Sequence, residues 1–128
     1  MADFSSIAQT FVDHYFTSFD DFDRRSSLAS LYRPESTLTW ESSALQGVQD
    51  IIGHLTKSEL KVTRHTISTV DSQPGTANGV VVLVTGTLAV DNDFDKPMIF
   101  TQSFTLAPIP GQPGAFSVQN QIFRLISG

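Results

Sequence analysis

The single tryptophan of this 128-residue chain, Trp40, stands next to a carboxylate, Glu41, and these two side chains could together recognise a partner. An indole offers a large apolar surface and one N–H donor, and a neighbouring negative charge favours a partner that carries a cation. The alternative is that Trp40 belongs to the hydrophobic core, because tryptophan side chains are usually largely buried. The two residues alone leave both interpretations open.

The composition limits the classes of protein to be considered. A chain of 128 residues with 40% apolar residues is expected to form a single domain over residues 1–128. The absence of cysteine removes disulfides and thiolate metal sites, and a net charge of −5 argues against binding to nucleic acid. We expect neither secretion nor membrane insertion, and no cofactor, because the sequence carries no signal segment, apolar span, phosphate loop or metal-binding cluster.

Three helices are predicted in the first half of the chain. Residues 3–20 repeat apolar side chains at helical spacing: Phe4, Ile7, Ala8, Phe11, Val12, Tyr15, Phe16 and Phe19. So many aromatic rings on one stripe indicate that this helix fills a concave surface, such as a curved sheet. After an acidic linker at residues 20–23, a serine can cap a short second helix that includes Tyr32 and ends at Pro34. A third helix is predicted to follow Gly47.

The second half of the chain changes to β-strand patterns. Four stretches rich in Val, Ile, Thr and Phe are predicted strands: residues 61–73, 80–91, 98–106 and 116–126. A further strand is expected to include Leu38 and Trp40. Helices followed by strands with short connections predict an α+β fold, in which three N-terminal helices pack on one face of a strongly curved, mainly antiparallel sheet.

The predicted strand at residues 80–91 has no clearly polar face. Its outward positions are apolar or threonine: Val81, Leu83, Thr85, Thr87 and Ala89. An antiparallel sheet with helices on one side should expose a polar outer face, so these positions predict a second cover. Another copy of the same sheet would supply it, which predicts a homodimer. A monomer that tolerates a threonine-rich outer face is the alternative.

Six short segments, taken in order, resemble the nuclear transport factor 2 family. They are Leu38-Thr39-Trp40-Glu41, Leu45-Gln46-Gly47, His65 in a threonine-rich strand, Asp71-Ser72-Gln73-Pro74, Gly86-Thr87-Leu88 before Asp91-Asn92-Asp93, and Ile122-Phe123-Arg124-Leu125. The resemblance covers essentially the whole chain. It implies a cone-shaped fold in a dimeric carrier that binds the GDP-bound form of the GTPase Ran and the Phe-x-Phe-Gly repeats of nucleoporins, and so returns Ran to the nucleus. It also implies a location in the cytoplasm and the nucleus, concentrated at the nuclear pore.

The same resemblance implies a Ran-binding site made of five residues. Trp40 would line the mouth of a hydrophobic cavity that accepts an aromatic side chain of Ran. Glu41, Asp91 and Asp93 would form an acidic rim around this mouth, where they would select a partner with basic residues beside the inserted ring. His65 would lie on the sheet under the same cavity.

Phe4 occupies the position at which the resemblance implies an exposed aromatic residue that contributes to the nucleoporin site. It could instead begin the buried stripe of the first helix. His65 could be a hydrogen-bonded structural residue, as a lone strand histidine often is. Asp91 and Asp93 could belong to an ordinary turn. The loop after Asp93 is also longer than the family pattern, by residues 94–97.

An enzyme is the rival class, because the same cone-shaped fold encloses active sites in steroid isomerases and dehydratases. Such a site needs a general base and a donor for a developing oxyanion. The candidates are His65 with Tyr15 or Tyr32. Glu41 is a further candidate, but a carboxylate at a strand end beside water is poorly placed for a raised pKa. A transport carrier is therefore the first hypothesis, a small-molecule isomerase or dehydratase the second, and an adaptor module the third.

Overall fold

The computed structural model describes residues 3–91 and 95–126. In chain order the elements are α1 (Phe4–Asp20), α2 (Phe22–Arg25), the 3₁₀ helix η1 (Ser26–Leu31), β1 (Tyr32–Trp40), β2 (Ser43–Gln46), α3 (Val48–Leu55), η2 (Ser58–Leu60), β3 (Thr63–Pro74), η3 (Thr76–Asn78), β4 (Val80–Val90), β5 (Met98–Pro108) and β6 (Phe116–Ile126). The α-helices among these elements all precede β3, as predicted.

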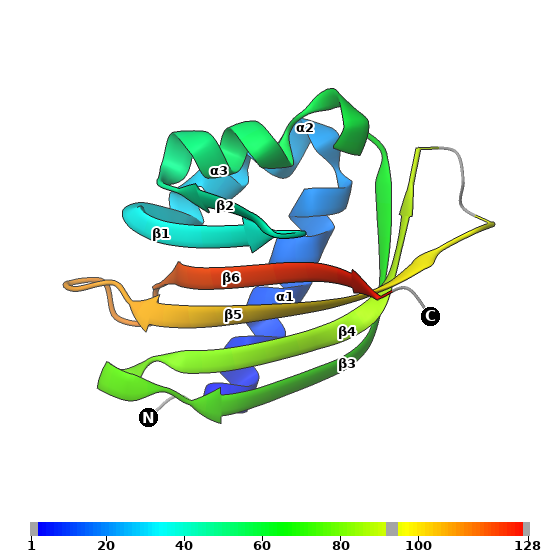
Figure 1. Ribbon diagram of the computed structural model, residues 1–128. Coiled ribbons are helices and arrows are strands. Elements are labelled where there is room, and N and C mark those ends of the chain that lie inside the picture. The colour runs from blue at the N-terminus through cyan, green and yellow to red at the C-terminus, as the bar shows by residue number, and fades with distance from the viewer. Residues whose placement is uncertain (1–2, 92–94, 127–128) are drawn as a thin grey trace.

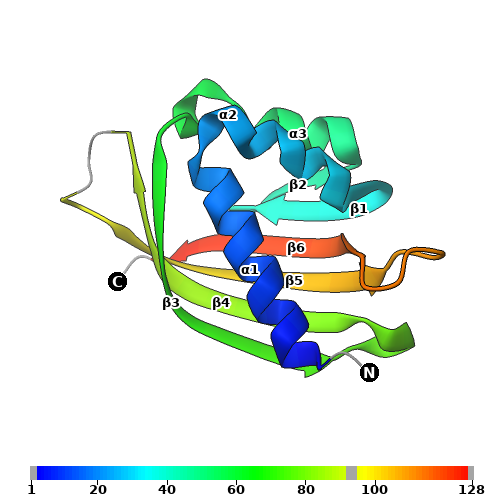
Figure 2. The ribbon, with the colours of Figure 1, turned by 180° about the vertical axis from the view of Figure 1, so that it is seen from behind.

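The six strands form one sheet in the order β2-β1-β6-β5-β4-β3. Neighbouring strands are antiparallel except β1 and β6, which are parallel. Helix α1 crosses one face of the sheet diagonally, and α3 lies near the edge of the sheet that β1 and β2 form (Figures 1 and 2). The sheet bends around α1 and leaves its opposite face without helices. The predicted α+β fold, with three helices on a curved and mainly antiparallel sheet, is confirmed.

The apolar stripe of α1 packs into the concave face of the sheet. Phe11, Tyr15, Phe16 and Phe19 are all buried. The rings of Phe11 and Phe104 of β5 meet edge to face, with centroids 4.9 Å apart. Because these large rings need a hollow to fill, the aromatic stripe explains why the sheet is curved rather than flat.

Strand β4 shows the alternation expected of a half-covered sheet. Its inward residues Val80, Val82, Val84 and Leu88 are buried, whereas Val81 and Leu83 on the outer face are 41% and 43% exposed. Ala89 was predicted to face outward but is only 4% exposed. The outer face of β4 is therefore apolar and open to solvent in the single chain.

The second helical region differs from the prediction at both ends. The carboxylate of Asp21 accepts a hydrogen bond from the backbone N–H of Asp23 at 3.2 Å, so the acidic segment predicted as a linker starts helix α2. Tyr32 is the first residue of β1, and Pro34 lies within this strand. Pairing with β6 shifts register between Tyr32 and Thr37, and a proline without an N–H is tolerated at such an irregular point.

The hairpin of β1 and β2 has no counterpart in the sequence prediction. Trp40 pairs with Ser43, so Glu41 and Ser42 form a two-residue turn with φ values of 51° and 76°. Such turns usually contain Asn or Gly, which adopt positive φ most easily. Because Glu and Ser occupy these positions here, the sequence does not indicate a turn. The turn also removes Glu41 from the strand in which it was expected.

Candidate binding site

Four of the five residues predicted to bind Ran lie at one end of the sheet. Strands β1, β4 and β6 run in the same direction and finish at this end, which we name the mouth end. Trp40 is the last residue of β1 and Glu41 follows it, Asp91 directly follows β4, and His65 lies near the start of β3, which begins here. Asp93, the remaining predicted residue, lies outside the described residues.

Aromatic rings hold Trp40 in place at the mouth end. Its ring is nearly parallel to that of Phe123, with centroids 3.9 Å apart, and to that of Phe19 at 6.5 Å. The ring of His54 from α3 contacts it more edge-on at 5.0 Å. Trp40 is nevertheless only partly buried. The residue is thus anchored by the core and still reaches the surface, so it combines features of both sequence interpretations.

The two described carboxylates of the predicted rim, Glu41 and Asp91, are exposed. The carboxylate of Glu41 accepts a hydrogen bond from the backbone N–H of Leu125, and its own N–H donates to the carbonyl of Phe123 at 3.1 Å. Asp91 has a φ of 55° and donates its N–H to the carbonyl of Val62 at 2.8 Å. The carboxylate of Glu41 and the backbone of Asp91 are therefore held by hydrogen bonds, and both residues are exposed.

His65 is a buried, hydrogen-bonded residue. Its Nδ1 and its backbone N–H both lie 2.7 Å from carboxylate oxygens of Asp20, at the end of α1. Its ring contacts Phe16, Phe19 and Phe100 at centroid distances of 4.7, 5.1 and 5.3 Å. Only 2% of the His65 side chain is exposed. This environment favours the structural alternative, in which His65 supports the mouth end from beneath.

Asp20 joins α1 to the start of β3. Its carboxylate also accepts a hydrogen bond from the hydroxyl of Thr63 at 2.8 Å. Burial acts to raise the pKa of Asp20, but the hydrogen bonds from His65 and Thr63 and the attraction of the imidazole outweigh it, so the pKa lies below the ordinary value of 3.8. The charged form of Asp20 is therefore the one that the fold stabilises.

Arg25 is a structural residue of the mouth end that the sequence did not reveal, because arginine is mostly found at the surface and Arg25 stands in an Arg-Arg pair. It is fully buried. Its guanidinium donates to four backbone carbonyls and one hydroxyl: Phe19 O (2.6 Å), Leu55 O (3.1 Å), Leu60 O, Lys61 O (3.3 Å) and Thr63 Oγ1 (3.2 Å).

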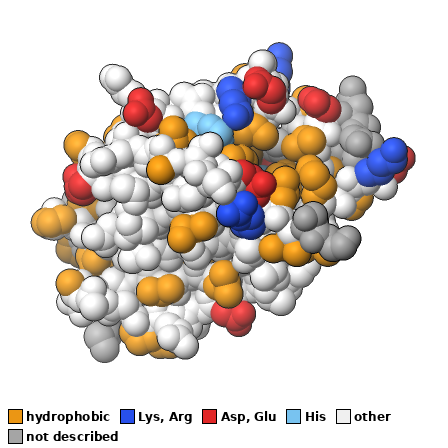
Figure 3. All heavy atoms as spheres, viewed as in Figure 1, with side chains coloured by type: hydrophobic (Ala, Val, Ile, Leu, Met, Phe, Trp, Pro, Cys, Tyr) orange, Lys and Arg blue, Asp and Glu red, His pale blue; other side chains and the backbone are white. Residues whose placement is uncertain are grey.

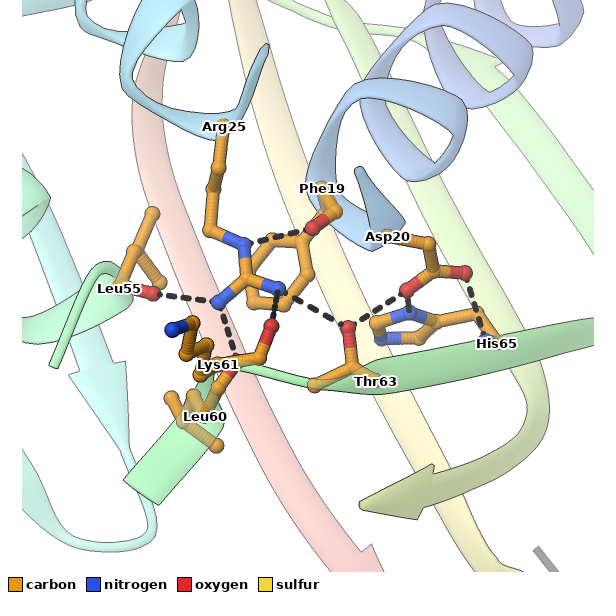
Figure 4. Close-up of polar contacts among 8 residues, drawn as sticks. All are labelled: Phe19, Asp20, Arg25, Leu55, Leu60, Lys61, Thr63 and His65. Carbon is orange, nitrogen blue, oxygen red and sulfur yellow. Dashed lines mark hydrogen bonds and ion pairs between the residues drawn. The ribbon is translucent and has the colours of Figure 1, made fainter. Parts of the chain in front are cut away.

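Figure 4 shows how Arg25 connects the elements around the mouth end. The guanidinium lies over the ring of Phe19, 4.3 Å from its centroid, and reaches Asp20 through the hydroxyl of Thr63. Burial lowers the pKa of Arg25, and the charge of Asp20 counters this effect. Since Phe19 in turn stacks on Trp40, the arginine fixes one of the rings that hold the tryptophan.

The residues predicted for an enzyme do not assemble into a catalytic pair. Tyr15 and Tyr32 bond to each other at 3.0 Å, and both bond to the side chain of Gln121, at 2.9 and 2.6 Å. Burial raises the pKa of both hydroxyls above 10.0. This closed triangle stabilises the core and contains no contact with His65. The described residues also include no cluster of acidic or histidine side chains placed to hold a metal, and no helix long and apolar enough to cross a membrane.

Phe4 lies at the opposite end of α1 from the mouth end. It is 38% exposed, so it does not continue the buried stripe. Together with Ile7, Pro74, Pro108 and Phe116 it lines a cavity of about 490 Å³, which we name the Phe4 cavity. An exposed aromatic side chain beside an apolar hollow is a suitable place for a ring from a partner to bind.

The outer face of the sheet carries apolar residues that the helices leave uncovered. Its exposed apolar residues come from three adjacent strands: Val81, Leu83, Ile99, Ile122 and Ile126. Ile99 and Ile126 are 57% and 48% exposed and are directly paired, and Ile122 is 54% exposed. Figure 3 shows hydrophobic groups spread over this side of the molecule, mostly among uncharged polar ones and with a few charged side chains between them. Exposed apolar residues grouped in this way often mark a site where another protein binds.

A helix enclosed by a curved sheet, with an anchored tryptophan and exposed carboxylates at the mouth end, defines the class of cone-shaped α+β domains. Residues 7–125 match the model of the nuclear transport factor 2 domain. The chain belongs to the nuclear transport factor 2 family.

Relatives named nuclear transport factor 2 match nearly the whole chain. The protein from Emericella nidulans is 49% identical over 127 residues, which cover 98% of each chain. The protein from Saccharomyces cerevisiae is 42% identical over 124 residues, which cover 96% of this chain and 94% of the relative. The solved structure of nuclear transport factor 2 from Cryptosporidium parvum superimposes with a TM-score of 0.84 at 36% identity, covering 96% of this chain and 94% of the other.

Proposed function

We propose that this chain is a nucleocytoplasmic transport factor that binds GDP-bound Ran at the mouth end and carries it into the nucleus. Trp40 would contact an aromatic side chain of Ran. The acidic rim would be formed by Glu41, Asp91 and Asp93, and His65 would support the site from beneath. The observation that supports this most directly is that a partly exposed, firmly held tryptophan shares one end of the sheet with two exposed carboxylates.

The chemistry of the mouth end suits a basic partner with an exposed ring. An apolar surface supplies affinity through desolvation, while carboxylates at its edge speed the encounter with lysine and arginine and reject acidic partners. The net charge of −5 acts in the same direction over longer distances. The role is one of binding, and we propose no catalytic residue.

Movement through the nuclear pore requires a second contact. Phe4 and its cavity are proposed to bind the phenylalanine rings of Phe-x-Phe-Gly nucleoporins, at the opposite end of α1 from the Ran site. The two partners would then bind at the same time. The protein would be found in the cytoplasm and the nucleus and would be concentrated at the pore.

The proposed active form is a homodimer held by the outer face of the sheet. A second copy covers the exposed side chains of β4, β5 and β6 with an identical surface, as two-fold symmetry requires. This arrangement leaves the mouth end of each chain free for its own molecule of Ran.

The test is a pull-down with purified Ran loaded with either GDP or GTP. We expect the chain to retain the GDP-bound form and to bind the GTP-bound form much more weakly. A Phe-x-Phe-Gly peptide immobilised in parallel checks that the protein is folded and able to bind. Retention of both nucleotide forms to the same extent, or of neither, would disprove the proposed import function.

A further inference from the structure

His54, in the last turn of α3, brings a titratable ring to Trp40, the only tryptophan of the chain. The two rings meet at an angle of 61°, with centroids 5.0 Å apart. The other rings described at this indole, those of Phe19 and Phe123, cannot change their charge. Of these ring contacts, the one with His54 is therefore the contact that pH can alter.

The geometry indicates that the imidazole of His54 is neutral in this fold. Its Nδ1 lies 3.5 Å from the Nζ of Lys57, and because an ammonium can only donate, Nδ1 is the acceptor and the ring proton belongs on Nε2. Nε2 is buried and has no hydrogen-bond partner among the described residues. A second proton would have to bind at Nδ1, where it would remove the acceptor and place two cations side by side.

The charges near His54 act in both directions. Burial and the charge of Lys57 lower the pKa of His54 below its ordinary value of 6.5, and Glu59 of η2 counters them only in part. Of the elements packed on α3, η1 and β2 contain no charged residue, and the charged residues of β1 stand near its start, away from Trp40. The other charged groups to be considered are Asp50, one turn earlier on α3, Glu41 beside Trp40, and Arg25, which bonds to the carbonyl of Leu55.

We propose that His54 is a positioning residue of the mouth end, whose neutral ring holds the indole of Trp40 and whose protonated ring weakens the binding of a basic partner. This inference rests on the proposed Ran site and adds a pH dependence to it. A protonated ring loses its contact with Lys57 and has to turn toward water, which frees one edge of the indole. It also adds a positive charge to a surface proposed to attract lysine and arginine. Both effects lower the affinity as the pH falls.

The single tryptophan allows the contact to be tested without a partner. An imidazolium quenches indole emission much more than a neutral imidazole does. Trp40 fluorescence should therefore fall as the pH is lowered from about 8 to about 5, with a midpoint below 6.5. His54→Phe keeps a ring against the indole but cannot titrate, so the fall should disappear, whereas His14→Gln, at an exposed position of α1, should preserve it. A wild-type chain without this transition, or a transition that survives in His54→Phe, would overturn the inference.

Two substitutions of opposite sign check that the transition belongs to His54. Lys57→Gln removes a cation that disfavours the imidazolium, so the midpoint should move to higher pH. Glu59→Gln removes an anion that favours the imidazolium, so the midpoint should move to lower pH. Midpoints that do not respond to either change would assign the transition to another group and overturn the inference.

Titration with Ran-GDP tests the effect on binding. The quantity compared is the ratio of the affinities of wild type and His54→Phe at each pH, because groups that titrate elsewhere on either protein cancel in this ratio. The ratio should fall roughly threefold or more between pH values of about 7.5 and about 5.5. At the higher pH, His54→Phe should retain more affinity than His54→Ala, which lacks a ring to hold the indole.

Failure of this inference differs from failure of the proposed function. A ratio that stays constant with pH, or equal binding by the Phe and Ala variants, would overturn the role of His54 while Ran binding stands. If wild type does not bind Ran-GDP at any pH, the proposed import function is wrong and the effect on binding falls with it. The fluorescence titration would still decide whether His54 controls the environment of Trp40.

Discussion

Trp40 packs against the core and is proposed to bind Ran, and the two roles can be separated by truncating it. Trp40→Ala removes the contacts with Phe123, Phe19 and His54. Truncating a fully buried ring to alanine lowers the unfolding free energy by about 3–5 kcal/mol. Because Trp40 is partly exposed, the loss should be smaller. A hot-spot aromatic contributes about 2 kcal/mol or more to binding, so Ran-GDP affinity should fall roughly thirtyfold.

Thermal unfolding and titration with Ran-GDP measure these two effects on the same samples. Trp40→Phe is the matched control, because it keeps a ring on Phe123 and should retain more affinity than the alanine variant. A Trp40→Ala protein that melts many degrees lower but, while folded, binds Ran at full strength would place Trp40 in the core alone.

Glu41 carries a charge that faces water and an oxygen that bonds to the backbone of Leu125. Glu41→Gln keeps an acceptor oxygen and removes only the charge, whereas Glu41→Lys removes both. We expect Ran-GDP affinity to fall in the order wild type, Gln, Lys, and unfolding free energy to fall by about 1 kcal/mol for the lysine variant only.

Affinity for a Phe-x-Phe-Gly peptide is the internal control for both Glu41 variants, since the site proposed for this peptide lies at the other end of α1. Equal losses of Ran and peptide binding in Glu41→Lys would mean that Glu41 acts through the fold. The loss of Ran affinity should also shrink as salt is added, because an exposed charge is screened over about 8 Å at physiological ionic strength.

Among elements, those with a strong periodic pattern were predicted well and those with an irregular start were not. The bounds predicted for the first helix, residues 3–20, and for the strand at residues 80–91 agree with α1 and β4 within one residue, although Phe4 and Ala89 depart from the predicted pattern of burial. The hairpin of β1 and β2 was missed because Glu41 and Ser42 occupy positive-φ positions without Gly or Asn. The parallel pairing of β1 with β6 joins segments some 80 residues apart, and no local pattern encodes it.

Arg25 joins elements that the sequence pattern treats separately. It donates to carbonyls at the end of α1, the end of α3, the last residue of η2 and the residue after it, and it bonds to the first residue of β3. Its importance could not be predicted, because burial of an arginine depends on carbonyl groups that only the tertiary fold brings together. Arg24 beside it is exposed.

The pair Arg24 and Arg25 offers a test with a matched control. Arg25→Lys leaves one ammonium to replace a planar group with five N–H donors, so several buried carbonyls lose their partners. We expect it to reduce the unfolding free energy by about 2–4 kcal/mol in chemical denaturation, whereas Arg24→Lys should change it by less than about 0.5 kcal/mol. Similar effects of the two substitutions would argue against the structural role of the buried guanidinium.

At the scale of the whole molecule, three surfaces face in different directions. The mouth end carries Trp40 and the exposed carboxylates of Glu41 and Asp91, the N-terminal half of α1 lines apolar cavities, and the face without helices carries exposed isoleucine, leucine and valine. The alternation of side chains along residues 80–91 predicted that the outer face of the sheet would be apolar. It could not predict the cavities, because their walls combine α1 with turns and strands from distant parts of the chain.

The outer face predicts that the chain of 14.0 kDa forms a homodimer of about 28 kDa. Ile122→Glu tests this, since the side chain is 54% exposed in the single chain and its replacement leaves the core intact. Two-fold symmetry would place two carboxylates in one apolar interface, at a cost of several kcal/mol, so light scattering at micromolar concentration should report a monomer. Gln49→Glu, exposed in the first turn of α3, adds the same charge away from this face and should remain dimeric. A wild-type monomer, or an unaffected Ile122→Glu dimer, would show that another surface or none joins the chains.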